Sequence, residues 1–110
     1  MNINSHPLMV IDQKEPCYSI NSNQFLTASI AEEIRAEIRS CLEQEYPVIY
    51  LDAKDVDEVD LSGINEVIHS HYTLLQASKK LIFVYRKNSK VEKWVETTGL
   101  DKFIDTAIAQ

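Results

Sequence analysis

The sequence predicts an α/β fold: one domain with a mixed sheet of four to five strands and helices packed on it. Two wholly apolar runs, residues 48–51 and 81–85, are typical of strands buried on both faces. The segment between them has an apolar stripe at helical spacing, formed by Ile64, Val67, Ile68, Leu74 and Leu75 and continued by His71. A strand, a helix and a strand in succession form a βαβ unit, which almost always makes a right-handed parallel pair.

The N-terminal part predicts a hairpin followed by a helix. Residues 8–11 and 17–20 have the composition of two short strands, and the polar residues between them turn the chain at Pro16. Ser29 and Glu32 have the spacing of a capping box, which predicts a helix that ends near Gln44. The apolar stripe of this helix comprises Ile30, Ile34, Ile38, Cys41 and Leu42.

The C-terminal part predicts a third helix and a short edge strand. Ser89 and Glu92 repeat the capping-box spacing, and Gly99 followed by Leu100 is typical of a left-handed helix end. Val91, Trp94, Val95 and Thr98 are expected to face the sheet. We place the edge strand near residues 103–104.

Composition bounds the possible functions. A chain of 110 residues holds one core, so we expect a single domain over residues 1–110. The net charge of -6 disfavours nucleic acid and anionic membranes as partners, because both require a basic surface. No stretch resembles a membrane span or a signal peptide, which predicts a cytoplasmic protein. Cys17 and Cys41 are expected to be buried, inert thiols.

The polar residues do not form a recognisable catalytic or metal site. The acidic loop fails the calcium-loop pattern, because Val59 stands at a ligand position and Asp60 at the glycine position, so we interpret it as a solvated rim. This loop contains Asp52, Asp55, Asp57, Glu58 and Asp60. His69 and His71 point to different sides of a helix, and His71 fits a core or boundary position. We therefore predict no enzyme activity, no cofactor and no metal.

The junction from Asp60 to Gly63 is the strongest functional candidate. Ser62 has the chemistry of an N-cap, and Gly63 could ease the turn into the helix. A hydroxyl at a helix N-terminus is also a place where a phosphate is tolerated, since the helix dipole favours negative charge there. Both interpretations remain open from the residues alone.

This junction resembles the STAS domain, the fold of bacterial anti-sigma factor antagonists and of the cytoplasmic tails of sulfate transporters. The resemblance rests on Asp60-Leu61-Ser62-Gly63 and on Gly99-Leu100, and it is best over residues 48–104. In that family a kinase phosphorylates the first serine or threonine after the aspartate. Leu61 occupies this position here and has no hydroxyl.

Three explanations of Leu61 follow from the resemblance. The protein binds its partner without modification, or Ser62 has become the phosphate acceptor, or the domain serves a complex that does not use phosphorylation. We favour the first, because an apolar residue at a helix start suits a permanent protein contact.

The resemblance also implies a protein partner that contacts the acidic loop and the first turns of the following helix. The expected contact residues are Asp57, Glu58, Asp60, Leu61, Ser62, Gly63, Ile64, Asn65 and Glu66, with Ser70 as an extension. The expected partner is a serine kinase or anti-sigma factor of the histidine-kinase-like ATPase class. The alternative is that the chain is the small STAS subunit of an ABC-type lipid transport complex and stabilises its ATPase. A small-molecule or nucleotide binder is a third class, to which no residue can be assigned.

Overall fold

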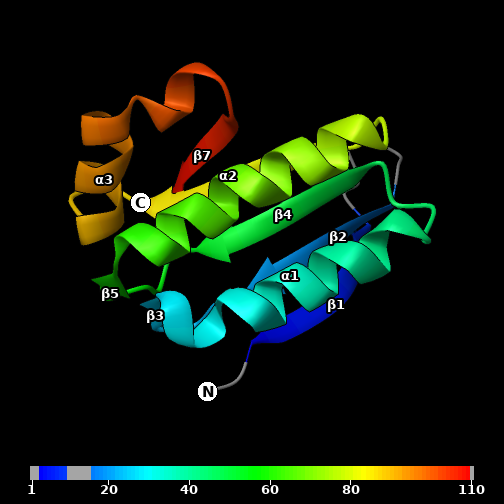
Figure 1. Cartoon of the computed structure of the whole chain (residues 1–110), viewed down its shortest axis with the longest axis horizontal. Coiled ribbons are helices and arrows are strands. Elements are labelled where there is room, and N and C mark those ends of the chain that lie inside the picture. The colour runs from blue at the N-terminus through cyan, green and yellow to red at the C-terminus, as the bar shows by residue number, and fades with distance from the viewer. Residues whose placement is uncertain (1–2, 10–15, 110) are drawn as a thin grey trace.

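A five-stranded mixed sheet carries three helices on one of its faces (Figure 1). The computed structural model describes residues 3–9 and 16–109. The strand order is β1-β2-β4-β6-β7, in which β1 is antiparallel to β2 and the other neighbours are parallel. The predicted α/β class and mixed sheet are therefore confirmed. The sheet strands are β1 (Asn4–Met9), β2 (Pro16–Asn21), β4 (Val48–Ala53), β6 (Lys80–Arg86) and β7 (Asp105–Ala109).

The helices follow the parallel strands, as the βαβ prediction requires. They are α1 (Ala28–Leu42), α2 (Leu61–Gln76) and α3 (Lys90–Thr98), and a short 3₁₀ helix, η1 (Leu100–Lys102), follows α3. Two further strands of two residues each, β3 (Phe25–Leu26) and β5 (Glu58–Val59), pair in parallel beside the starts of α1 and α2. This small second sheet was not predicted.

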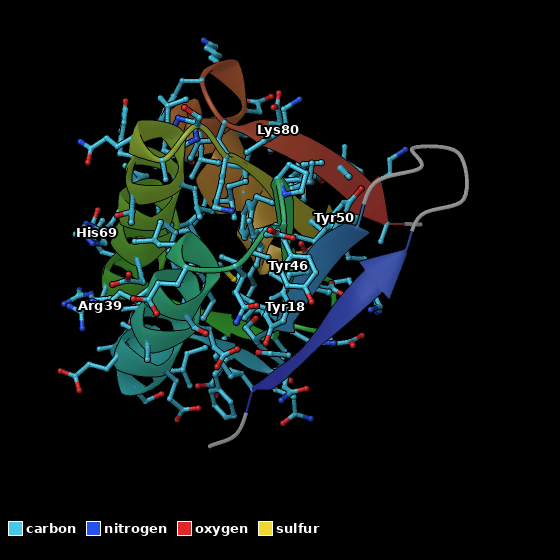
Figure 2. The ribbon with its side chains drawn as sticks, turned by 90° about the vertical axis from the view of Figure 1, so that its right-hand side faces the viewer. Tyr18, Arg39, Tyr46, Tyr50, His69 and Lys80 are labelled. Carbon is cyan, nitrogen blue, oxygen red and sulfur yellow. The ribbon has the colours of Figure 1, made fainter. Side chains whose placement is uncertain are left out.

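One face of the main sheet forms the core, and the other face is only half-buried. Ile49, Leu51 and Ala53 of β4 are buried in one cluster with apolar residues of all three helices. Val48 and Tyr50 alternate with them and are half-buried. The expectation that residues 48–51 and 81–85 are buried on both faces is therefore wrong. Figure 2 shows α1 and α2, which carry Arg39 and His69, to the left of the sheet that carries Tyr50.

Several element boundaries differ from the prediction. Strand β1 begins at Asn4 rather than at residue 8, and residues 10–15, which include part of the predicted turn, lie outside the described residues. The predicted capping box at Ser29 is wrong, because α1 begins at Ala28 and its N-cap Thr27 makes no side-chain cap. This helix ends at Leu42, before the predicted Gln44.

The C-terminal helix confirms its predicted signals. Ser89 accepts a hydrogen bond from the amide of Glu92 at 3.2 Å, and Gly99 closes the helix in the left-handed conformation with φ 67°. Val91 and Val95 are buried, but Thr98 is exposed and its hydroxyl donates to the carbonyl of Trp94. The final strand is present, but it starts at Asp105 because residues 100–102 form a 3₁₀ turn first.

Both thiols lie out of reach of solvent. Cys17 and Cys41 are free cysteines with 0% and 1% exposure. Burial raises the pKa of Cys41 to about 11, with a smaller contribution from Glu37, and burial also raises the pKa of Cys17.

Because both thiols are buried, we expect iodoacetamide to leave the native protein unmodified at neutral pH and to add two groups after denaturation, as measured by intact mass. Rapid alkylation of the native chain would contradict this burial.

Candidate docking surface at the start of α2

Asp60 organises the junction between the acidic loop and α2. As the N-cap of α2 it accepts a hydrogen bond from the amide of Gly63 at 2.9 Å. Its second carboxylate oxygen lies 3.4 Å from the amide nitrogen of Ala28, the first residue of α1. One side chain therefore satisfies free amides at the starts of two helices. The prediction that Ser62 is the N-cap is wrong, because Ser62 already lies in the first helical turn.

Gly63 allows the start of α2 to approach the chain between β3 and α1. A Cβ atom at this position would lie 1.8 Å from the carbonyl oxygen of Leu26. That same carbonyl accepts a hydrogen bond from the amide of Asp60 at 3.2 Å. The glycine is therefore required by close backbone contact rather than by a turn.

The predicted contact residues divide into an exposed and a buried group. Leu61 is 58% exposed, and Asp57, Glu58, Ser62 and Asn65 are also exposed, while Asp60 is half-buried. Gly63 and Ile64 are buried, and so are Glu66, at 3% exposure, and Ser70, at 0%. The expectation that the side chains of the buried group are available at the surface is wrong, because they point toward the core or toward α1.

Glu66 forms an ion pair that joins α2 to α1. Its carboxylate lies 2.7 Å from a guanidinium nitrogen of Arg35, which is 42% exposed. The hydrogen bond to Glu66 is the main reason that the pKa of Arg35 is raised. Burial of a carboxylate at this position would be costly without such a partner. The two residues share a groove of about 400 Å³ between the helices, together with Ser62, Asn65 and His69.

The buried face of α2 consists of small and apolar residues, and some of them were not part of the predicted apolar stripe. Gly63, Val67, Ser70 and Leu74 follow one another at helical intervals and are all buried. Glu66 lies beside this row, whereas Leu75, which we assigned to the apolar stripe, is 54% exposed. The small residues let α2 lie close to its neighbours, and they are the signal in the sequence that could have placed Glu66 inside.

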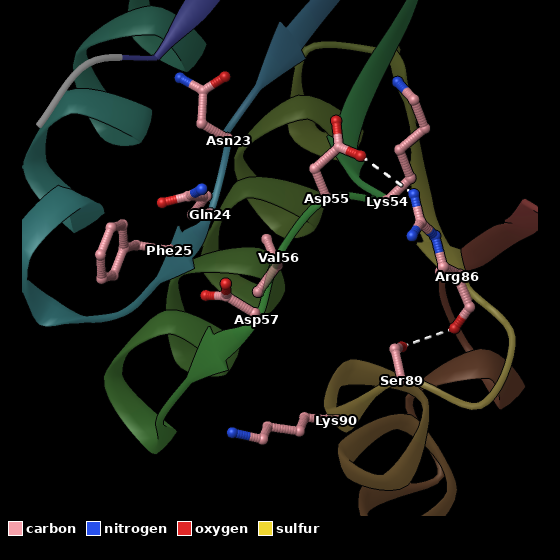
Figure 3. A pocket seen from close by; sticks show the side chains of 10 residues that line it. All are labelled: Asn23, Gln24, Phe25, Lys54, Asp55, Val56, Asp57, Arg86, Ser89 and Lys90. Atoms are coloured by element: carbon pink, nitrogen blue, oxygen red, sulfur yellow. Dashed lines mark hydrogen bonds and ion pairs between the residues drawn. The ribbon is translucent and has the colours of Figure 1, made fainter.

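The acidic loop is only partly a solvated rim. Asp52 pairs with Lys54 at 2.6 Å. Asp55 pairs with Arg86 at 3.1 Å, as Figure 3 shows. The hydrogen bond to Asp52 is the main cause of the raised pKa of Lys54. Lys54, Asp55 and Arg86 border an open groove of about 1020 Å³ at the carboxyl ends of the parallel strands. Asp57 and Glu58, by contrast, are exposed, and they are the exposed acids nearest to Leu61 in the sequence.

The histidines occupy the two environments that the helical spacing predicts. His69 is exposed, whereas His71 is half-buried with its ring edge-on to Tyr72 at 4.8 Å. Among the described residues, no group of three or more His, Cys, Asp or Glu side chains is placed to hold a metal ion. No helix in the described part of the chain is long and apolar enough to cross a membrane.

Replacement of Gly63 tests the close backbone approach. We expect Gly63→Ala to lower the free energy of unfolding by about 3 kcal/mol or more, because the new methyl group meets a backbone oxygen that cannot move freely. Urea denaturation measures the change. The matched control, Ser62→Ala, removes an exposed hydroxyl from the neighbouring residue and should change stability by less than about 0.5 kcal/mol. Equal effects of the two variants would contradict the close approach.

Replacement of Asp60 tests the shared cap. We expect Asp60→Ala to destabilise the fold by about 1–2 kcal/mol, since amides at two helix starts lose their acceptor. Asp60→Asn should recover most of this loss, because asparagine is also a good N-cap. Asp57→Ala, in the same loop, serves as the control in the same urea titration. A loss shared equally by the Asp57 and Asp60 variants would indicate a general charge effect instead.

Comparison with known proteins supplies the family. The STAS domain family matches residues 9–109 of this chain. None of the curated proteins compared is similar enough in sequence to count as a match.

Solved structures share the fold at low sequence identity. The anti-sigma factor antagonist SpoIIAA in its unphosphorylated form is 19% identical with a TM-score of 0.65, over 97% of this chain and 90% of that chain. The phosphorylated form of SpoIIAA, a Bacillus cell fate determinant, is 20% identical with a TM-score of 0.66, over 97% of this chain and 92% of that chain. A proposed anti-sigma factor antagonist from Thermotoga maritima is 19% identical with a TM-score of 0.75, over 96% of this chain and 86% of that chain. With its sheet order, its junction at Asp60 and a family match over nearly its whole length, this chain belongs to the STAS domain family.

Proposed function

We propose that this STAS domain is a non-enzymatic regulatory module that binds another protein through the start of α2. The observation that supports this best is Leu61, a leucine with 58% exposure at the first position of the helix. An exposed apolar side chain that is held on a well-capped helix start is a suitable anchor for a protein interface.

The surroundings of Leu61 favour a partner with a basic surface. Asp57 and Glu58 are exposed in the preceding loop, and Ser62 and Asn65 provide hydrogen-bonding groups on the same helix. An acidic rim around an apolar anchor orients a basic partner and speeds association more than it adds affinity. We call these five residues, Leu61 included, the docking surface.

The docking surface is suited to binding without a phosphate cycle. The structure of SpoIIAA is known in unphosphorylated and phosphorylated forms. At the position that the family uses as phosphate acceptor, this chain has Leu61, which cannot be phosphorylated. We therefore propose that the unmodified protein is permanently competent to bind. A modified Ser62 is the competing explanation, because its hydroxyl is exposed one residue further along α2.

The proposed partner is a serine kinase or anti-sigma factor of the histidine-kinase-like ATPase class. Support comes from the family and from the fold shared with anti-sigma factor antagonists. Occupation of such a partner by this chain would change how much sigma factor is free. The ATPase of an ABC-type lipid transporter is the alternative partner, and it requires no phosphorylation either.

Affinity capture with matched leucine variants tests the proposal. The tagged protein is used to capture partners from lysate of its own cells, and the captured proteins are identified by mass spectrometry. We expect a histidine-kinase-like ATPase with the wild-type chain and at least about a tenfold loss with Leu61→Asp, because a charge replaces the apolar anchor. Leu75→Asp is the control, since Leu75 has similar exposure, 54%, near the other end of α2.

The same experiment separates the alternatives. Equal capture by wild type and Leu61→Asp would remove the docking surface from the proposal, provided that circular dichroism shows both folded. Capture of a transporter ATPase that depends on Leu61 would support the alternative partner. An intact mass that is higher by one phosphate, located on Ser62, would show that binding is regulated one residue further along.

A further inference from the structure

The outer face of α2 carries a second, mostly apolar row whose members are exposed or half-buried, and of these Ile68 also packs against the core. Leu61, Asn65, Ile68, Tyr72 and Leu75 are separated alternately by four and three residues, which places them on one side of the helix. Leu61, Tyr72 and Leu75 are 58%, 49% and 54% exposed, Asn65 is exposed, and Ile68 is half-buried. The ring of Phe103 stacks on Tyr72 with 6.4 Å between the ring centroids and widens the apolar strip. We call these five α2 residues the outer seam.

The outer seam is close to symmetric about Ile68. If a second α2 helix packs antiparallel on the first with a two-fold axis near Ile68, Leu61 of each copy meets Leu75 of the other. Asn65 then meets Tyr72, so that a side-chain amide faces a phenol hydroxyl. Isologous contacts of this kind require a surface that complements itself about a two-fold axis. The spacing of this seam meets that requirement over its whole length.

The outer seam is also free of the charge that opposes self-association elsewhere on the chain. The protein carries a net charge of -6. Yet Glu66 is the only Asp, Glu, Lys or Arg in α2, and it is buried against Arg35 of the same chain. A second copy therefore meets no formal charge along this helix, whereas a general surface of this protein would repel it.

The neighbouring helix α1 extends the same symmetry with complementary charges. Its exposed outer row contains Glu32, Ala36 and Arg39. Helices α1 and α2 start side by side, since Asp60 reaches the amide of Ala28, and both run antiparallel to the parallel strands (Figure 1). The midpoint between Glu32 and Arg39 lies seven to eight residues from the start of α1, and Ile68 lies seven residues from the start of α2. One two-fold axis, lying across both helices, therefore serves both.

We propose that the outer face of the α1–α2 layer binds the same face of a second copy of this chain. The α2 helices pack through their outer seams, and Glu32 of each copy forms an ion pair with Arg39 of the other. Figure 2 shows the side chain of Arg39 pointing away from the sheet, as this contact requires. Two helices per copy form a small interface, at or below about 1,200 Å² in total, so the dimer forms at high protein concentration.

This dimer has a consequence for regulation, which rests on the proposed function. Leu61 belongs to both the outer seam and the docking surface, so a protein partner and a second copy compete for it. A change in the concentration of the chain would then change the fraction of docking surfaces that are free.

Sedimentation velocity of the full chain tests the inference. Between about 10 µM and about 1 mM we expect the mass to rise from the monomer value of 12.6 kDa toward twice that value. Leu75→Asp should weaken the dimer at least about tenfold. Ile108→Asp is the matched control, because Ile108 is 48% exposed on β7, away from this face, and it should leave the dimer unchanged.

Charge reversal tests the geometry of the contact independently. Glu32→Arg and Arg39→Glu should each weaken the dimer, because each places like charges opposite one another, and the double variant should restore it. A wild-type chain that stays monomeric at about 1 mM would overturn the inference. So would a dimer that survives Leu75→Asp, that is lost with Ile108→Asp, or that is not restored by the double charge reversal.

The dimerisation test and the partner-capture test can be distinguished with one variant, Leu75→Asp. Leu75→Asp removes the dimer and keeps the docking surface at the other end of α2, so partner capture should persist in that variant. A chain that fails to dimerise can still capture a partner, and a chain that captures no partner can still dimerise, so each proposal can fail alone.

Discussion

The close approach of α2 to the segment between β3 and α1 is the constraint on which the candidate surface depends. Gly63 has no side chain, and the backbone oxygen of Leu26 lies where a Cβ atom would be. The carboxylate of Asp60 then spans the two helix starts. Because both helices begin at one rigid point, Leu61 is held at the surface by well-defined backbone contacts. An exposed apolar residue with fixed geometry loses little conformational entropy when a partner binds it.

The charged residues around α1 and α2 fall into two groups: those that hold the fold together and those that are free to contact a partner. The buried Glu66 and the partly exposed Arg35 use opposite charges to join α2 to α1. The acids from the end of β4 to β5 also divide into two groups, since Asp52 and Asp55 are paired within the chain and Asp57 and Glu58 face solvent. The net charge of the chain therefore does not describe the surface that a partner meets. A neutral outer seam lies beside an acidic loop, and each favours a different kind of contact.

Helix α2 has apolar residues on two faces, which explains why its predicted apolar stripe was right for most positions and wrong for Leu75. Ile64, Val67 and Leu74 are buried as the helical spacing indicated, but Leu75 is exposed. Spacing alone favours the face with the largest apolar side chains. The buried face also includes Gly63 and Ser70, because small residues permit close packing against neighbouring backbone. The apolar residues left outside, including Leu61 and Tyr72, are those to which a binding role can be assigned.

Local spacing and short motifs were sufficient for the α/β class, the order of most elements, the left-handed helix end at Gly99 and the family. They also identified the junction at residues 60–63, including the replacement of the family's acceptor by Leu61. They identified the buried side of each helix but not every residue on it, since Leu42, Leu75 and Thr98 are exposed. The contact of Asp60 with Ala28, the reason for Gly63, the pairing of Glu66 with Arg35 and the half-buried second face of the sheet all depend on segments about 30 residues apart or more. A local sequence pattern does not indicate which distant segments come into contact. Only the folded chain therefore reveals which polar groups are satisfied and which apolar side chains remain free to bind.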